Sequence, residues 1–532
     1  MGGYQMKIER ILIEDQMAPI GLDEKKPAFS WLLTAEEGEQ NLMQSACRIV
    51  VRTGEDTVWD SGKMETGVST GIGYEGEALQ PCTKYEVKAE VWDNHGGKAE
   101  AESSFETGLM DSLYAAWEGA EWIGAPHATV CAENRGVFTI ESEFRMEGGK
   151  GEAGIVFGAN DFRLNDHTKN ELGMEGENYI RYAVCLEDGD ARLEIYRVGH
   201  APEDTAEKPF AVTKLVNWKE KTQEILTPEN ADAFHKLTVE VDGNVAYAYV
   251  DGILVDAIEE HGFFGTKVSG RQLNPRGNND VLPYPRLNEI GFYAGKGTTG
   301  YFKNLTVRNV RKPSAEIVRE TPEGRLDGGK SIFADQIPVE NGYFKVEDSQ
   351  ITADPSHHSI PMLRSCISCQ KEKKLASARL YITARGIYDC RINGQEITED
   401  LLRPGLTQYD HRMNYQTYDI TGLMKPGRNG IGVTLASGWW SEAQTFVVKN
   451  FNYFGDKESL LAKVVMKYED GSREVFGTNT EDWKYFGEGP YLFSSYFAGE
   501  QYDARRAEVY ETYSLPEFDD STWEKPVVVD TV

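Results

Sequence analysis

The sequence has no long hydrophobic run, and this absence argues against a membrane-spanning protein. No stretch of the 532-residue chain approaches the roughly 20 consecutive apolar residues that a membrane-spanning helix requires. Its first ten residues, MGGYQMKIER, lack the apolar core of a secretion signal. We therefore predict no association with a membrane, and the missing signal favours a cytoplasmic location.

Positive charge is also scarce. The chain has 56 lysines and arginines against 86 aspartates and glutamates, so its formal net charge is −30. Nucleic-acid binding depends on clustered lysine and arginine that neutralise the phosphate backbone. We predict that the chain binds no nucleic acid.

Cysteine is sparse, at seven residues with scattered spacing. An odd number of this kind predicts reduced thiols rather than a disulfide framework. Cys366 and Cys369 form a single CxxC pair. Because a structural zinc site needs four ligands and the sequence offers no second CxxC or HxxxH pair, we interpret this spacing as coincidence.

Helical periodicity is equally hard to find, and short alternating runs take its place. Ala378, Leu380 and Ile382 alternate with polar residues, as in a strand with one buried face. Turn dipeptides such as Asn393-Gly394 and Pro404-Gly405 punctuate these runs. The length suits about three to four domains. The sequence therefore predicts an all-β, multidomain chain built of β-sandwiches.

The stretch from Ser377 to Trp440 carries the most specific signal. Its marks are the SARLYIT strand, the Ile392–Gly394 turn, the YQTYDIT segment and the Gly438–Trp440 triplet, with GEQYDAR at Gly499–Arg505 downstream. Together they resemble the N-terminal domain of bacterial α-L-rhamnosidases, a galactose-binding-like β-sandwich. The resemblance implies part of an inverting glycoside hydrolase that removes terminal α-L-rhamnose from glycosides or polysaccharides.

The same resemblance implies that the catalytic residues lie elsewhere. In this family the acid and base sit on an (α/α)6 barrel that follows the β domains, and only 26 residues follow Arg506 here. The barrel C-terminal to this segment is thus an implied partner. Inversion needs two carboxylates about 6.5–9.5 Å apart. Glu500 and Asp503 are tempting, yet a tie to Arg505 or Arg506 explains them more simply. We predict no catalytic residue in this chain and no activity of the chain alone.

Four segments follow from the pattern. Residues 1–110 resemble a fibronectin type III domain, with Tyr85 as the tyrosine that bonds back at a sandwich corner. Residues 111–133 read as a linker and, at EWIGAP, the opening strand of the rhamnosidase domain. Residues 134–312 resemble an inserted concanavalin-like jelly roll, the fold of many carbohydrate-binding modules. Residues 313–532 complete the rhamnosidase β-sandwich, with Pro313 to Gly328 as a connector. Insertion at an exposed loop costs little free energy.

The insert offers the binding candidates. In rhamnosidases an insert at this place resembles a rhamnose-binding module that uses calcium, and calcium prefers six to eight oxygen ligands. The predicted sugar contacts are Asn160, Asp161, Tyr179, Asn278, Asn279 and Tyr284. The predicted calcium ligands are Asp161, Asn278, Asp280 and Pro283. The alternative is that such residues are what any long loop contains.

The first interpretation is that the chain is the accessory half of a rhamnosidase, and two other interpretations stay open. The chain is otherwise a stand-alone carbohydrate-binding protein, or a scaffold whose β domains only pack against other domains. Aromatic residues do not decide between them. Trp439 and Trp440 would point to opposite faces of a strand, which favours packing over sugar contact.

Overall fold

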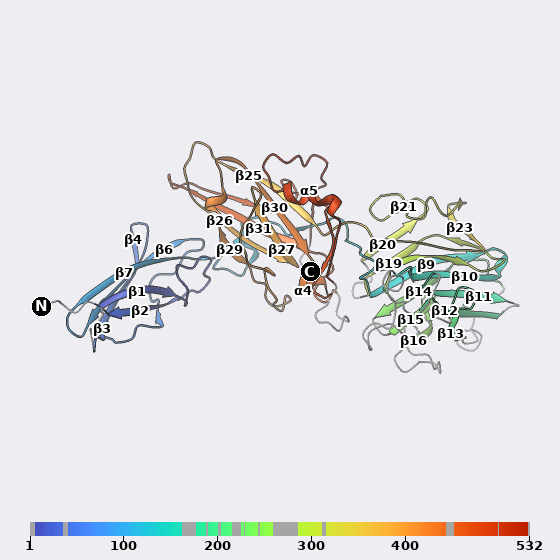
Figure 1. Ribbon diagram of the computed structural model, residues 1–532, viewed down its shortest axis with the longest axis horizontal. Coiled ribbons are helices and arrows are strands. Elements are labelled where there is room, and N and C mark those ends of the chain that lie inside the picture. The colour runs from blue at the N-terminus through green and yellow to red at the C-terminus, as the bar shows by residue number, and fades with distance from the viewer. Residues whose placement is uncertain are drawn as a thin grey trace.

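The computed structural model describes residues 6–35, 41–161, 177–187, 190–200, 204–214, 225–227, 229–242, 245–258, 286–310, 315–442, 452–497 and 499–529. Three β-rich bodies lie in a row (Figure 1). The body nearest the N-terminus stands at one end, and strands β9 to β24 form the body at the other end. Strands from the last part of the chain build the middle body. The all-β expectation is confirmed.

The N-terminal body, called here the first sandwich, packs a three-stranded sheet against a four-stranded sheet. The sheet orders are β1-β2-β5 and β4-β3-β6-β7. The strands are β1 (Met6–Ile13), β2 (Ala28–Ala35), β3 (Gln44–Thr53), β4 (Asp56–Asp60), β5 (Ile72–Gly73), β6 (Lys84–Asp93) and β7 (Lys98–Glu106). Trp31 and Val87 lie in the core between the sheets. The hydroxyl of Tyr85 accepts a hydrogen bond from the Gln80 N–H at 2.7 Å, the corner contact that the sequence predicts.

A short connection leads from this sandwich into the middle body. It contains the 3-10 turn η1 (Tyr114–Trp117) and the strand β8 (Ile123–Gly124). Strand β8 pairs with β31 (Ser459–Tyr468) and β36 (Val527–Val528), which come more than three hundred residues later. The EWIGAP segment therefore belongs to a sheet of the middle body, and the chain leaves that body before it returns.

The body at the far end, called here the inserted module, is a sandwich of two large sheets. The six-stranded sheet runs β13-β12-β11-β10-β17-β24, and the larger sheet runs β16-β15-β14-β9-β18-β23-β22 with β19, β20 and β21 attached. Its apolar core, which includes Phe157, Leu237 and Phe292, lies between the two sheets. The elements are β9 (Val137–Met146), η2 (Glu147–Gly149), β10 (Gly151–Ala159), β11 (Tyr179–Glu187), β12 (Asp190–Val198), β13 (Phe210–Lys214), β14 (His235–Asp242), β15 (Val245–Val250), β16 (Ile253–Ile258), β17 (Glu289–Ala294), β18 (Thr299–Phe302), β19 (Leu305–Arg308), β20 (Glu316–Thr321), β21 (Gly324–Arg325), β22 (Val339–Glu340), β23 (Tyr343–Glu347) and β24 (Gln350–Ala353).

The module ends later in the chain than the sequence predicts. Strand β20 pairs with β19, β23 with β18, and β24 with β17, so these strands belong to the module. The boundary between residues 312 and 313 is therefore wrong, and the module extends to Ala353. The predicted connector from Pro313 to Gly328 contains β20 and β21 instead. A short polar strand gains its order from distant partners, which a local pattern does not reveal.

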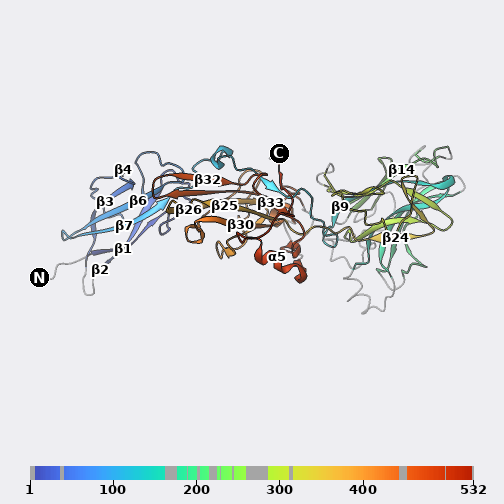
Figure 2. The same ribbon diagram turned by 90° about the horizontal axis from the view of Figure 1, so that it is seen from above.

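The middle body, called here the host domain, is also a two-sheet sandwich. Its sheets run β28-β27-β30-β25-β33 and β29-β26-β31-β8-β36, with β32 on β31, and Leu380 and Val433 lie in the core. The remaining elements are β25 (Met362–Cys369), β26 (Leu375–Arg385), β27 (Ile387–Ile392), β28 (Gln395–Glu396), β29 (Gln416–Asp419), η4 (Thr421–Leu423), β30 (Gly427–Ala436), α4 (Gly438–Ser441), β32 (Arg473–Gly477), β33 (Lys484–Phe486), β34 (Tyr491–Ser495), β35 (Gly499–Tyr502), η5 (Ala504–Arg506) and α5 (Ala507–Thr512). Seen from above, α5 lies on the outside of this body (Figure 2).

Two predictions about short segments can be compared with the structure of the host domain. Trp439 and Trp440 lie on the short helix α4, so the expected strand with opposite faces is wrong. Both rings pack against other aromatics, with Trp439 4.5 Å from Tyr496 between ring centres. All seven cysteines are free, and Cys369 is buried in the host core. In the part of the chain that the structure describes, the helices are too short or too polar to cross a bilayer.

Candidate functional site

The outer face of the six-stranded sheet carries a cluster of stacked polar and aromatic side chains. Strand alternation sends Phe157 toward the core and leaves Arg181 of β11 on the outer face. The Arg181 guanidinium lies between two tyrosine rings, 4.6 Å from the ring centre of Tyr196 and 3.8 Å from that of Tyr293. Cation–π attraction therefore holds the guanidinium against both rings.

Two carboxylates flank this arginine. The Tyr293 hydroxyl donates to Glu152 Oε2 at 3.2 Å, and Glu194 accepts from the Tyr196 hydroxyl. Burial raises the pKa of Glu152 and raises that of Tyr293 to about 12. Arg181 Nε and Glu152 Oε1 are buried and make no hydrogen bond with any residue that the structure describes. Because buried polar atoms are normally paired, these two atoms mark a place for the groups of a ligand.

One corner of the same face gathers the predicted residues Asn160 and Asp161. The Asn160 N–H donates to the Asn178 carbonyl at 3.0 Å, and the Asn160 side-chain amide donates to Glu289 Oε2 at 2.8 Å. Asp161 is buried, with 6% of its surface exposed. The Asn178 side-chain amide donates to the Gly158 carbonyl at 2.9 Å. Its Oδ1 is buried and has no hydrogen-bond partner among the described residues.

A buried ion pair supports this corner from the end of β12. Arg197 Nε lies 2.5 Å from Asp204 Oδ2, and Asp204 Oδ1 accepts from the His200 N–H at 3.1 Å. His200 Nδ1 lies 2.9 Å from the Val198 carbonyl and donates to it, which leaves Nε2 as an acceptor. Burial lowers the pKa of His200 to about 4, so this imidazole is neutral at neutral pH. Nε2 is buried and unpaired within the described ranges.

The structure places part of the predicted set of residues at this candidate site, together with residues that the sequence did not point to. Asn160 and Asp161 were predicted, whereas Asn178, Arg181 and His200 were missed. The YIRYAV segment does not by itself mark Arg181 as a binding residue. The one available clue is that a charged residue interrupts an otherwise apolar strand. Tyr179 has 5% of its surface exposed and packs against Val156, Ala159 and Val198 on the same face. Asn278, Asn279, Asp280, Pro283 and Tyr284 lie outside the described residues.

The corner offers the type of ligand atom that calcium prefers. The Asp161 carboxylate, just after β10, and the partnerless Asn178 Oδ1, just before β11, are hard oxygen donors. Six to eight oxygens complete a calcium site, so these two supply part of a set. The described residues therefore fit calcium in chemistry, with the remaining ligands to come from elsewhere.

The carboxylates of the GEQYDAR segment have structural partners. Asp503 accepts two hydrogen bonds from Arg505, each 2.8 Å long, which hold the pKa of the Asp503 carboxyl at about 2. Arg506 Nε lies 3.5 Å from the same carboxylate. Glu500 accepts a hydrogen bond from the Ser494 hydroxyl at 3.3 Å on the neighbouring strand. The Asp503 contacts agree with the predicted tie to Arg505 or Arg506, whereas the contact of Glu500 is with Ser494 instead of an arginine.

Comparison with protein families matches both ends of the chain. Residues 8–111 match a Rha78A-like N-terminal immunoglobulin domain, and residues 373–532 match an α-L-rhamnosidase N-terminal domain. The first of these is an immunoglobulin domain where the sequence predicts a fibronectin type III domain. The two classes share the sandwich of antiparallel sheets and the tyrosine corner, which explains the substitution of one for the other.

Known proteins give the same family. An α-L-rhamnosidase from Streptomyces avermitilis is 27% identical over 523 residues, which are 96% of this chain and 44% of that protein. One from Formosa agariphila is 37% identical over 151 residues, 28% of this chain and 16% of that protein. The chain thus spans less than half the length of these relatives.

A solved structure of the Streptomyces avermitilis enzyme, complexed with L-rhamnose, shares the fold. It superimposes with a TM-score of 0.55 at 21% identity, covering 99% of this chain and 45% of that one. The matched domains at both ends, together with this relative along nearly the whole chain, lead to one conclusion. The chain carries two domains of the types found at the N-terminus of α-L-rhamnosidases, an immunoglobulin domain over residues 8–111 and an α-L-rhamnosidase N-terminal domain over residues 373–532.

Proposed function

We propose that this chain is the non-catalytic N-terminal portion of an inverting α-L-rhamnosidase, and that its inserted module binds rhamnose-containing carbohydrate. The single observation that carries the binding role is the outer face of the six-stranded sheet. There, Arg181 lies between two tyrosines beside buried polar atoms that lack partners.

The chemistry of this face suits a sugar. A pyranose presents an apolar C–H face and a ring of hydroxyls, which match aromatic surfaces and unpaired polar atoms respectively. Arg181 Nε can donate to a hydroxyl, while Glu152 Oε1 and His200 Nε2 can accept from one. A monosaccharide has few atoms, so we expect an affinity of about millimolar to tens of micromolar. The solved relative complexed with L-rhamnose supports the choice of sugar.

We propose calcium as the cofactor of this module. Asp161 and Asn178 would hold it through their side-chain oxygens. When bound, the ion would accept vicinal hydroxyls of the sugar. The protein's own part is to fix these two oxygens, through the Asn160 to Asn178 backbone bond and the Asn178 to Gly158 bond.

Calorimetry with L-rhamnose tests this function on the whole chain. Heat of binding is expected in calcium and is expected to disappear in chelator. If the folded chain gives no heat in either condition, the module is not a rhamnose-binding module and the scaffold interpretation replaces it.

Catalysis is proposed to reside on the helical barrel of the full enzyme, outside these residues. The purified chain should release no nitrophenol from an aryl α-L-rhamnoside, because Glu500 and Asp503 are engaged in structural contacts. Turnover that is lost in Glu500→Gln or Asp503→Asn, measured beside the unmodified chain, would contradict this assignment.

A scaffold role for the other two bodies has its own support. Arg379 of the host domain makes two hydrogen bonds with Glu106 of the first sandwich, at 2.6 and 2.7 Å. The Tyr415 hydroxyl donates to Asp23 at 2.7 Å and accepts from the Leu109 N–H at 2.7 Å. These contacts brace the first sandwich against the host. They favour a supporting function for those bodies, while the module carries the binding.

A further inference from the structure

The chain enters and leaves the inserted module at one narrow place. Val130 and His357 form an isolated antiparallel bridge there, with backbone hydrogen bonds of 3.0 and 2.9 Å. Directly beside it, the rings of His127 and His358 stack with centres 5.3 Å apart and planes 11° from parallel. Residues 127–130 and 355–359 are called the neck below.

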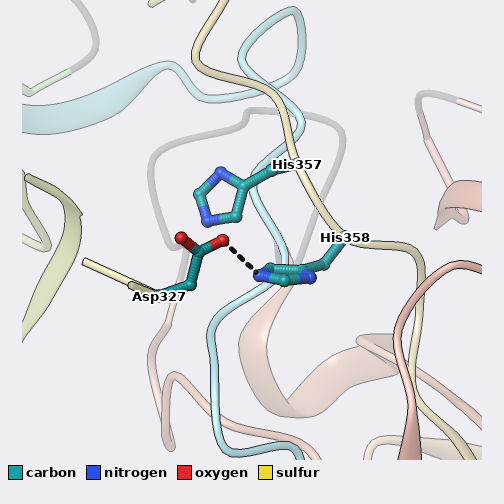
Figure 3. A group of neighbouring side chains, drawn as sticks. All are labelled: Asp327, His357 and His358. Atoms are coloured by element: carbon teal, nitrogen blue, oxygen red, sulfur yellow. Dashed lines mark ion pairs between the residues drawn. The ribbon is translucent and has the colours of Figure 1, made fainter. Parts of the chain in front are cut away.

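A third group reaches the neck from the module itself. Asp327 lies in the turn after β21, and its carboxylate faces both His357 and His358 (Figure 3). One ligand atom from each of the three residues lies within 4.8 Å of the other two. His358 Nε2 is 3.2 Å from Asp327 Oδ2, and it is buried without a properly angled hydrogen bond to any described residue.

We propose that Asp327, His357 and His358 bind a divalent transition metal such as zinc, which fastens the inserted module to the host domain. Two imidazoles and one carboxylate are a ligand set that zinc takes when a fourth position is left to water. Imidazole nitrogen favours zinc and its neighbours over calcium, which prefers oxygen. The site is thus distinct in chemistry from the oxygen-rich corner of the module.

The surroundings orient both histidines for this role. His357 Nδ1 lies 2.8 Å from the Pro355 carbonyl and donates to it, so the Nε2 lone pair is free to bind a metal. Metal-binding histidines commonly donate their second N–H to a carbonyl or carboxylate in this way. His358 Nδ1 faces Glu488 Oε1 at 3.8 Å.

One neighbour opposes metal binding and sets the expected strength. Arg325 lies 3.0 Å from Asp327 Oδ2, and the other oxygen, Oδ1, accepts from the Gly329 N–H at 2.9 Å. The guanidinium repels a cation and competes for the carboxylate. The ligands of a tetrahedral zinc site lie about 3.3 Å apart, so the three side chains must also close slightly. We therefore expect micromolar rather than nanomolar affinity.

Titration of the metal-free whole chain tests the proposal. Zinc is added under calorimetry, and cobalt is added under visible absorption, where a tetrahedral site gives intense bands. One equivalent per chain is expected, with affinity at least tenfold weaker in His358→Ala and in Asp327→Asn. His411→Ala is the matched control, because His411 is an exposed histidine 3.9 Å from Asp410 and should leave binding unchanged.

Two further observations keep the test decisive if one variant fails to fold. Asn at position 327 keeps the acceptor for the Gly329 N–H, so Asp327→Asn preserves the turn even if His358→Ala disturbs the neck. In the wild-type chain, zinc should slow amide exchange in the neck. Absence of stoichiometric binding, binding that survives both variants, or binding lost in Cys366→Ser instead would each overturn the proposal.

Discussion

Each outer face of the inserted module carries an arginine stacked on two aromatic rings, and the two arginines differ in their hydrogen bonds. On the larger sheet, Arg145 lies 4.5 Å from the ring centre of Tyr301 and 5.7 Å from that of Phe234, and it pairs with Asp232 at 3.0 Å. On the six-stranded sheet, Arg181 also lies over two rings, yet its Nε is buried and makes no hydrogen bond with a described residue.

The difference separates a structural contact from a candidate site. A stacked arginine that pairs with a carboxylate and is partly exposed contributes little free energy beyond packing. A buried donor beside a buried acceptor, each without a partner, costs free energy unless a ligand completes it. Stacking alone is therefore not evidence of a binding face, whereas stacking with unsatisfied polar atoms is.

The largest effect is expected from the ion pair that holds the polar corner. Arg197→Ala removes the guanidinium that pairs with the buried Asp204 carboxylate and should destabilise the module by about 3–5 kcal/mol. Arg192→Ala on the same strand removes partly exposed pairs with Glu187 and Glu194 and should cost less, about 1 kcal/mol. Amide exchange in β11 and β12 of the whole chain measures both, and equal losses would show that the corner is not specially stabilised.

A smaller effect, on ligand binding, is expected at Asp161. Asp161→Ala removes a charged oxygen from the corner and should weaken calcium-dependent rhamnose binding at least tenfold, or about 1.4 kcal/mol. Asp232→Ala, on the other face, should leave the affinity unchanged. Calorimetry in calcium decides, and an unchanged affinity in Asp161→Ala would remove this residue from the site.

The smallest effect concerns the pH dependence of stability. Burial raises the pKa of Glu152 above 4.5, so its favourable contribution is present below pH 4.5 and is lost as pH rises through the higher folded value. Glu152→Gln should therefore raise the melting temperature at pH 7, and the gain should vanish below pH 4.5. Glu143→Gln, which breaks a pair with Lys303 on the other face, should give no such gain. A gain that persists in acid would contradict burial as the cause.

The β-sandwich architecture could be predicted from the sequence, because period-two alternation and turn dipeptides are patterns of neighbouring residues. The sequence also located β8 in the host domain, because EWIGAP has a specific family pattern. The end of the module was misplaced, since β20 to β24 are short strands whose order comes from pairing with β17, β18 and β19.

The site was harder to predict for a related reason. Asn160 and Asp161 stand out because they follow an apolar strand. Arg181 and Tyr293 are more than a hundred residues apart, and only the pairing of β10 with both β11 and β17 brings them together. Likewise, Asp327 and His358 meet only because the insert returns to its host at the neck. Such groupings depend on topology, which a scan along the chain does not supply.

The most direct test of the account compares the two stacked arginines by calorimetry. L-rhamnose is titrated into the whole chain in calcium, and into its Arg181→Ala and Arg145→Ala variants. The account predicts an affinity at least tenfold weaker in Arg181→Ala and within about twofold of the original in Arg145→Ala. Equal affinities in all three proteins, or loss in Arg145→Ala alone, would contradict the assignment of the binding face to the six-stranded sheet.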